Sequence, residues 1–329
     1  MKSVMNKLFV QLRALVDEIF YEIRSKKAGV AFIAISVIIL TIAVTTLKDA
    51  KLPEPVEKPD TTQDEHIRLV SALSSVNVEA QSVYVLRPST NEVLFDKNSD
   101  DKRPIASLAK LATVYVASLV LNDTDELSVS SRALEEVGTS GLSIYQKIKF
   151  IDLAQFSLVS SSNGGAYAIA ENAGKKIDPA SSDFVASFLA FAHQNLERLG
   201  FNSFELKNAN GLDFLQLEPG AFASAREYSM FVAHIMKERP DILELSRESE
   251  VNVWLENNLV KGENTNPYLS SYAGHIASKT GYTKLAGGNL VLVMNIGLND
   301  PLIITVLGSS EEGRFTDAYT IYKTIVERI

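Results

Sequence analysis

A run of 20 residues without one charged side chain, AGVAFIAISVIILTIAVTTL at residues 28–47, constrains this 329-residue chain more than any other feature. A helix of that length rises about 30 Å, the thickness of the hydrocarbon core of a bilayer. A secretory signal peptide has a shorter apolar region followed by a small-x-small cleavage site, whereas Lys48-Asp49 follows this run directly. We therefore expect residues 28–47 to form one retained transmembrane helix.

The charges around this run predict its orientation. Residues 1–27 carry six Lys or Arg and three Asp or Glu, whereas the whole chain has a net charge of −8. The positive-inside rule then keeps the N-terminus cytoplasmic and places the C-terminal bulk outside a single-pass cell membrane anchor. Apolar residues recur at helical spacing in residues 1–27. This tail is expected to lie on the membrane, to pair with a partner helix, or simply to extend the anchor.

The next segment has the composition of a tether. Residues 48–66 contain three prolines and nine formal charges, so they cannot bury enough apolar surface to fold and are expected to be extended. Residues 67–329 then form one folded domain. The chain has no cysteine, which excludes disulfides and thiol catalysis, and its four histidines are scattered, so no metal and no cofactor are expected. The acidic balance argues against a nucleic-acid partner.

Within residues 67–329 the order of elements predicts an α+β fold. Gln81–Arg87 and Glu92–Asp96, joined by a Pro-Ser-Thr-Asn turn, predict a hairpin. Three late apolar runs predict strands, at Gly274–Lys279, Asn289–Ile296 and Leu302–Leu307. Because short loops join the late strands, they should be antiparallel and should complete a sheet of about five strands with the hairpin.

Helices are expected between and after these strands, giving an all-helical middle region that covers the sheet. The periodicity and the capping residues predict helices at Ser107–Leu121, from an Asp152 cap to Ser160, from a Ser181 or Ser182 cap to Gly200, from a Ser224 capping box to Pro240, and at Glu312–Ile329.

Three short polar motifs carry the chemistry. In Ser107–Lys110 (S-L-A-K) a hydroxyl and an amine lie three residues apart, on one face of a helix, so the amine can act as the base that activates the serine. Ser161–Asn163 (S-S-N) ends an apolar helix, and Lys279–Gly281 (K-T-G) ends an apolar strand. Each motif alone is weak, since each occurs by chance in unrelated chains.

In this order and spacing, the motifs resemble those of the D-alanyl-D-alanine carboxypeptidase family of low-molecular-mass penicillin-binding proteins, which share the β-lactamase/transpeptidase fold. The likeness covers about residues 80–326. It includes the hairpin, the segment RPIASLAKL at 103–111, the stretch NANGLD at 208–213 and SARE at 224–227. The resemblance implies a membrane-anchored serine enzyme that removes the terminal D-Ala from peptidoglycan stem peptides and is acylated by β-lactams.

The resemblance also implies a role for each residue of the first two motifs. Ser107 would be the nucleophile that forms the acyl-enzyme, and Lys110 would take its proton. Ser161 would relay a proton to the leaving D-Ala nitrogen. Asn163 would hold Lys110 and the substrate amide.

The third motif is implied to bind the substrate and to complete the oxyanion hole. Lys279 and Thr280 would bind the terminal carboxylate, and Gly281 would allow the substrate backbone to approach the strand closely. The backbone N–H groups of Ser107 and Tyr282 would form the oxyanion hole.

Three departures from the family pattern stand out. Gly164 follows Asn163 where Asp or Asn is common, Ala209-Asn210 replaces Pro-His, and Asn264-Thr265-Asn266 occupies the region where some members carry an arginine. Three alternatives stay open: a D,D-endopeptidase that acts on cross-links, a class A-like β-lactamase, and a non-catalytic muropeptide-binding module. The S-S-N triplet and the lack of an E-x-x-L-N-like loop disfavour the β-lactamase.

Overall fold

The computed structural model describes residues 61–138, 141–255 and 258–328. The expected cytoplasmic tail, the expected transmembrane helix at 28–47 and residues 48–60 of the expected tether lie outside these ranges. Within them, no helix combines the length and the apolar character needed to cross a bilayer. Helix α3 (Thr61–Ser74) begins inside the expected tether, so the prediction of an extended chain is wrong for residues 61–66. Residues 62–329 form one compact unit.

The predicted antiparallel sheet of five strands is confirmed. Its strands are β1 (Ser82–Arg87), β2 (Glu92–Lys97), β10 (His275–Thr283), β11 (Gly287–Gly297) and β12 (Asp300–Ser309). Their order is β10-β11-β12-β1-β2, so the N-terminal hairpin joins the late strands through the β1–β12 pairing and β10 is an edge strand. The late strands run further than expected, and β10 continues through the K-T-G motif.

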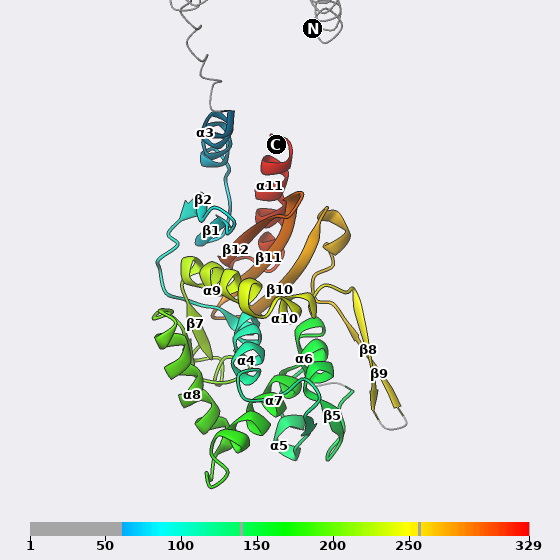
Figure 1. The fold of residues 1–329 in the computed structure, drawn as a ribbon. Helices are drawn as coiled ribbons and strands as arrows, with labels where there is room; N and C mark the ends of the chain where they lie inside the picture. Colours follow the sequence, from blue (N-terminus) through cyan, green and yellow to red (C-terminus); the bar gives the residue numbers. More distant parts are fainter. Residues whose placement is uncertain (1–60, 139–140, 256–257, 329) are drawn as a thin grey trace, which may run out of the picture. The chain divides into compact units, whose positions relative to one another are not determined.

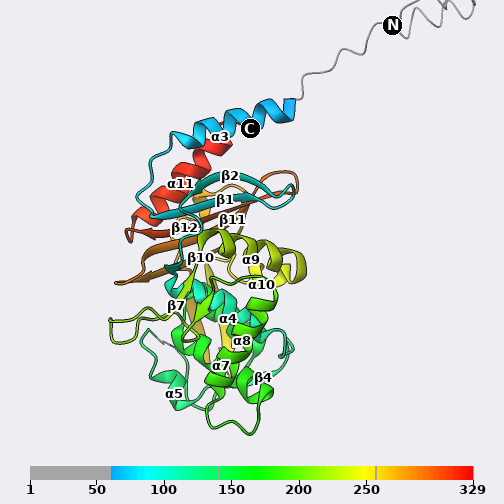
Figure 2. The same cartoon turned by 90° about the vertical axis from the view of Figure 1, so that its left-hand side faces the viewer.

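Alternation along the strands divides the core into two layers (Figures 1 and 2). Val83 and Val85 pack with α3 and with α11 (Gly313–Val326) on one face of the sheet. Tyr84 and Leu86 face the other way, toward α9 (Ala225–Glu238) and the helical region that contains α4 (Ala109–Ala117). The sheet therefore supports a separate helical layer on the face where the S-x-x-K motif lies.

The middle region is mainly helical, but it is not all-helical as expected. Its helices are η1 (Ala106–Leu108), α4, α5 (Ser131–Leu134), α6 (Phe150–Val159), α7 (Asn163–Ile177), α8 (Phe184–Arg198), α9 and α10 (Pro240–Glu244). Short strands lie among them: β3 (Arg103–Pro104), β4 (Glu126–Ser128), β5 (Lys147–Lys149), β6 (Glu205–Leu206) and β7 (Ala221–Ala223). The hairpin β8 (Glu250–Leu255) and β9 (Asn258–Glu263), followed by η2 (Leu269–Ser271), was not predicted.

Two of the predicted helix caps differ. Helix α6 starts at Phe150, so Asp152 lies in its first turn and does not cap it. The cap of α8 is Asp183, whose side chain accepts a hydrogen bond from Ala186 N, rather than Ser181 or Ser182. The predicted Ser224 cap of α9 is confirmed, since its hydroxyl accepts a hydrogen bond from Glu227 N.

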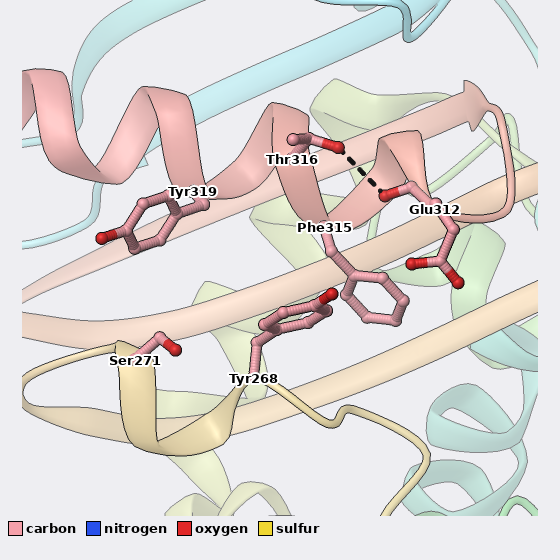
Figure 3. Close-up of a pocket in the computed structure, with 6 residues that line it drawn as sticks. All are labelled: Tyr268, Ser271, Glu312, Phe315, Thr316 and Tyr319. Carbon is pink, nitrogen blue, oxygen red and sulfur yellow. Dashed lines mark hydrogen bonds between the residues drawn. The ribbon is translucent and has the colours of Figure 1, made fainter.

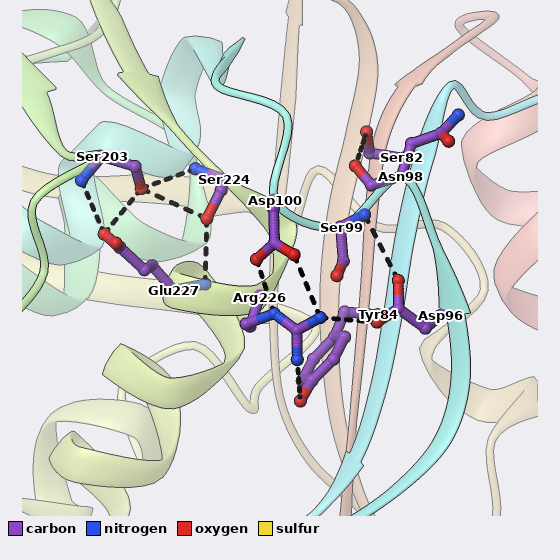
Figure 4. Close-up of polar contacts among 10 residues, drawn as sticks. All are labelled: Ser82, Tyr84, Asp96, Asn98, Ser99, Asp100, Ser203, Ser224, Arg226 and Glu227. Atoms are coloured by element: carbon purple, nitrogen blue, oxygen red, sulfur yellow. Dashed lines mark hydrogen bonds and ion pairs between the residues drawn. The ribbon is translucent and has the colours of Figure 1, made fainter.

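A polar network ties the start of α9 to the β1–β2 hairpin (Figure 4). The Arg226 guanidinium donates to Asp100 at 2.6 Å and to Asp96 at 2.7 Å, and it lies over the ring of Tyr84 at 4.8 Å. The two carboxylates hold the pKa of Arg226 above its ordinary value. Arg226 thus joins the helical layer to the edge of the sheet opposite β10.

We expect Arg226→Met to lower the free energy of unfolding by about 1–2 kcal/mol, because it removes the hydrogen bonds to Asp96, Asp100 and the Tyr84 hydroxyl and one cation–π contact. The matched control is Lys237→Met on the same helix, whose exposed side chain pairs only with Glu238 and should change stability by about 0.5 kcal/mol or less. Denaturant unfolding curves measure both. Equal midpoints for the two variants would show that the network does not hold the layers together.

Candidate active site

Ser107 lies in a tightly built turn between β3 and α4. The preceding residue, Ala106, has a φ of +47°, a left-handed conformation that non-glycine residues seldom adopt. Gly211 packs against this turn so closely that a Cβ there would lie 1.9 Å from Ala106 O. The turn therefore holds Ser107 in the middle of η1, which directly precedes α4.

The amine of Lys110 meets the Ser107 hydroxyl, as the S-x-x-K spacing predicts. Lys110 is fully buried, and its Nζ lies 2.7 Å from Ser107 Oγ and 2.9 Å from the backbone oxygen of Asn210. Burial, and then the charge of Lys279, lower the pKa of Lys110 well below its ordinary value. A neutral amine at this distance can accept the proton of the hydroxyl.

Ser161 of the second motif and Lys279 of the third motif are in contact at the same site. Ser161, at the end of α6, has a φ of +56°, which aims its side chain away from the helix that precedes it. The buried Lys279 Nζ donates to Ser161 Oγ at 2.9 Å and to Thr280 O at 2.9 Å. Burial, with a smaller effect of Arg314, lowers the pKa of Lys279 to about 7.

Asn163 does not lie as expected. The family resemblance implies that Asn163 holds Lys110. Among the described residues, however, its side-chain amide donates to Val137 O, and its Oδ1 is buried without a hydrogen-bond partner. The reason is that Asn163 is the first residue of α7, whose N-cap Ser162 accepts a hydrogen bond from Gly165 N. The amine of Lys110 is held by the Asn210 carbonyl instead.

Strand β10 passes directly beside the nucleophile. A Cβ on Gly281 would lie 2.7 Å from Ile105 O and 3.1 Å from Ser107 N, so only glycine allows this approach. The backbone of Gly281, the residue before Tyr282, therefore lies beside the Ser107 amide. The Gly281 carbonyl accepts a hydrogen bond of 2.8 Å from the buried Arg314, which anchors the strand from behind.

We expect Gly281→Ala to slow acylation of Ser107 by at least about 10²-fold, because the added methyl forces β10 away from the Ser107 amide. The matched control is Gly297→Ala, whose Cβ would meet only Asp300 Cβ at 3.7 Å, an ordinary contact at the far end of β11. Stopped-flow measurement with a chromogenic cephalosporin gives both rates. Acylation of Gly281→Ala at the wild-type rate would show that this close approach is not needed.

Three further residues of the site were not predicted as functional. Thr265 Oγ1 lies 2.6 Å from Thr280 Oγ1, Arg314 supports the Gly281 carbonyl, and Asn210 contributes its backbone oxygen to Lys110. Thr265 and Asn210 were noted only as departures from the family pattern. Backbone contacts such as that of Asn210 leave no mark in a sequence.

A second hollow of about 430 Å³ lies between η2 and α11 and contains none of the three motifs (Figure 3). Tyr268, Phe315 and Tyr319 supply its apolar walls, and the rings of Tyr268 and Phe315 lie 5.2 Å apart.

Within the part of the chain that the structure describes, no group of three or more His, Cys, Asp or Glu could hold a metal ion.

Comparison with known proteins places these observations in a family. The family model for D-alanyl-D-alanine carboxypeptidase matches residues 69–311. The chain is 25% identical to D-alanyl-D-alanine carboxypeptidase DacA of Haemophilus influenzae over 70% of its length, and it spans 57% of that protein. It is 26% identical to the D-alanyl-D-alanine endopeptidase of Pseudomonas aeruginosa, over 72% of this chain and 74% of that one.

The fold is shared with a solved penicillin-binding protein. Penicillin-binding protein D2 from Listeria monocytogenes, in its ampicillin-bound form, aligns with a TM-score of 0.63 and 22% identity, over 76% of this chain and 98% of that one. Because the family model spans the sheet, the helical layer and all three motifs, the chain belongs to the D-alanyl-D-alanine carboxypeptidase family.

Proposed function

We propose that this protein is a serine D-alanyl-D-alanine carboxypeptidase that removes the terminal D-Ala from peptidoglycan stem peptides. One observation carries the proposal. A buried lysine with a lowered pKa lies 2.7 Å from the Ser107 hydroxyl, and a second buried lysine lies on the opposite motif. Buried amines are costly, and their pairing with two serines at one site is typical of a nucleophile and its base.

In the first step, Lys110 takes the proton of Ser107 as Oγ attacks the carbonyl carbon of the penultimate D-Ala. The negative charge that forms on the carbonyl oxygen is stabilised by the N–H groups of Ser107 and Tyr282. Ser161 relays the proton that Lys110 took to the nitrogen of the leaving D-Ala as the C–N bond breaks, so Lys110 is again a free amine. Water then attacks the resulting ester, Lys110 takes a proton from the water, and it gives this proton to Ser107 Oγ as the ester C–O bond breaks.

The carboxylate of the terminal D-Ala is bound at the other end of the site. In its ammonium form Lys279 supplies positive charge, and the paired hydroxyls of Thr280 and Thr265 supply hydrogen-bond donors. Asn163 contributes its Oδ1, which lacks a partner among the described residues, as an acceptor for the substrate amide. This proposal departs from the sequence analysis, in which Asn163 also holds Lys110.

The two lysines predict a bell-shaped dependence of kcat/KM on pH. On the acidic side the rate falls as Lys110 becomes protonated, and the pKa of Lys110 lies well below the ordinary lysine value. On the alkaline side the rate falls as Lys279 loses its charge near pH 7. Initial rates of D-Ala release from a pentapeptide across pH 5–10 test this. A rate that keeps rising to pH 10 would mean that the base is an ordinary, exposed amine.

A specific observation favours a second candidate function, D,D-endopeptidase action on cross-linked stem peptides. The chain is as similar to the Pseudomonas endopeptidase, at 26% identity over 72% of its length, as to the Haemophilus carboxypeptidase, at 25% identity over 70%. The same residues would cleave both substrates. Mass spectrometry of digests of monomeric pentapeptide muropeptides and of purified cross-linked dimers separates the two, since only the endopeptidase converts dimers to monomers.

β-Lactams are proposed as covalent inhibitors that acylate Ser107, supported by the shared fold of the ampicillin-bound Listeria protein. We further propose that residues 28–47 anchor the protein in the cell membrane, with residues 1–27 cytoplasmic and the catalytic domain outside. Protease treatment of intact spheroplasts tests the orientation, because only the catalytic domain should be digested from outside.

A further inference from the structure

Glu136 lies two residues after the end of α5, near the catalytic amine of Lys110. The proposed reaction gives this carboxylate no role. Its side chain is largely buried, with 15% of its surface exposed. One carboxylate oxygen accepts a hydrogen bond of 2.8 Å from the side-chain amide of Asn210, and the other lies 3.3 Å from the Arg132 guanidinium. Glu136 is thus connected to the residue whose backbone oxygen holds Lys110.

Glu136 contacts the loop that contains Ala209 and Asn210, and this loop accepts two hydrogen bonds from side chains of α4. Asn210 O lies 2.9 Å from Lys110 Nζ, and Ala209 O accepts a hydrogen bond of 2.7 Å from the buried Thr113, one turn further along the helix. The Asn210 side chain has no freedom to move, because its Oδ1 accepts a hydrogen bond from Leu212 N while its amide donates to Glu136. The position of the Asn210 carbonyl therefore depends on the Glu136 carboxylate.

The same segment also contacts the second motif. Val137, directly after Glu136, offers its backbone oxygen to the Asn163 amide, and a Cβ on Gly138 would lie 3.1 Å from Asn163 Nδ2. Residues 136–138 therefore contact both Asn210, which holds Lys110, and Asn163, which is proposed to bind the substrate amide.

We infer that Glu136 is a positioning residue for the proposed acylation: through Asn210 it fixes the carbonyl that holds the Lys110 amine, and its negative charge opposes that of Lys279. This inference rests on the proposed function. Two charged groups act on Lys110 from the elements packed against it, Lys279 from β10 and Glu136 from the segment after α5, with Arg132 behind Glu136. Lys279 lowers the pKa of Lys110 and Glu136 raises it.

The sign of the effect follows from these charges. Glu136→Gln keeps an acceptor for the Asn210 amide but removes the negative charge, so the pKa of Lys110 falls further and the free amine persists to lower pH. The acidic limb of acylation should therefore move to lower pH by about half a unit or more. Glu136→Ala removes the acceptor as well, and the maximal rate should fall about tenfold, because the amine loses its fixed position.

The neighbouring residue offers a matched control. Glu135 also pairs with Arg132, at 3.1 Å, but its side chain is 66% exposed and, among the described residues, makes no hydrogen bond or ion pair with the loop at Asn210. Glu135→Gln removes the same charge one residue away, so it should leave both the limb and the maximal rate unchanged within about twofold.

The experiment measures the second-order rate of labelling by a fluorescent penicillin from pH 5 to pH 9, with the full-length protein in detergent and its three variants. A shifted limb in Glu136→Gln alone supports the inference. Superimposable profiles for Glu136→Gln and the wild type, or an equal shift in Glu135→Gln, would overturn it while the proposed function stands. A wild-type protein that is not labelled at any pH would overturn both.

A second readout does not depend on labelling or on the stability of Glu136→Ala. The ¹³Cε signal of Lys110, assigned by its loss in Lys110→Met, reports the protonation of the amine directly. It should titrate at lower pH in Glu136→Gln than in the wild type. An unchanged titration would contradict the inference.

Discussion

We expect Ser107→Ala to abolish covalent labelling by fluorescent penicillin and release of D-Ala, and to leave the fold intact. The hydroxyl is the one atom that the proposed mechanism requires to form a bond to the substrate, and alanine offers no nucleophile in its place. We expect a loss of at least about 10⁴-fold, limited by the detection of the assay. The midpoint of unfolding should stay within about 1–2 °C, because the partner of the hydroxyl, Lys110, keeps its hydrogen bond to the Asn210 carbonyl.

The matched control for this variant is Ser118→Ala, at the C-terminal end of α4. Its hydroxyl donates only to the backbone oxygen of Tyr115, one turn earlier. Labelling and D-Ala release should both be unchanged. Persistent labelling of Ser107→Ala at a substantial rate would mean that the nucleophile is another residue.

Lys110→Met should reduce the rate of acylation by about 10²–10⁴-fold, which is the usual contribution of a general base. Methionine fills a similar volume in the buried site, so the change removes the amine with little loss of packing. The Asn210 carbonyl loses its partner, at a cost of about 1–3 kcal/mol. The measurement is the second-order rate constant of penicillin labelling at the pH optimum.

Two comparisons separate the role of Lys110 from a general effect of charge. Lys102→Met removes an exposed amine that pairs with Glu205 and should acylate at the wild-type rate. Lys279→Met should raise KM for peptides that end in a carboxylate more than it lowers the maximal rate. If Lys110→Met kept the wild-type acylation rate, the base would have to be a different group.

Much of the fold could be predicted because it depends on local patterns. Two short strand-like runs joined by a turn specify the hairpin at residues 82–97, continuous apolar runs specify the three late strands, and the Ser224 cap specifies the start of α9. The spacing of Ser107 and Lys110 predicts that the two side chains meet, and they do, although Ser107 lies in η1 and only Lys110 lies in α4. The five-stranded antiparallel sheet follows from these elements and from their short connections.

What could not be predicted depends on contacts between distant segments. The sequence alone offers no reason why Lys110 should be held by a backbone oxygen a hundred residues away, or why the Asn163 amide should bond Val137 instead. In the hairpin β8–β9 the polar and apolar residues alternate only over Glu250–Val253 and not along β9, so the pattern is too short to predict both strands. Helix α3 begins in a segment whose charges and prolines suggest an extended chain.

The most direct test of Ser107 as the acylated nucleophile is a mass measurement. The full-length protein is incubated with benzylpenicillin, digested with trypsin, and searched for peptides that have gained mass. Because opening of the β-lactam ring loses no atoms, the account predicts that the peptide of residues 103–110 gains the full mass of penicillin, with fragmentation placing the ester on Ser107. An adduct on any other residue, or no adduct in a folded protein, would contradict it.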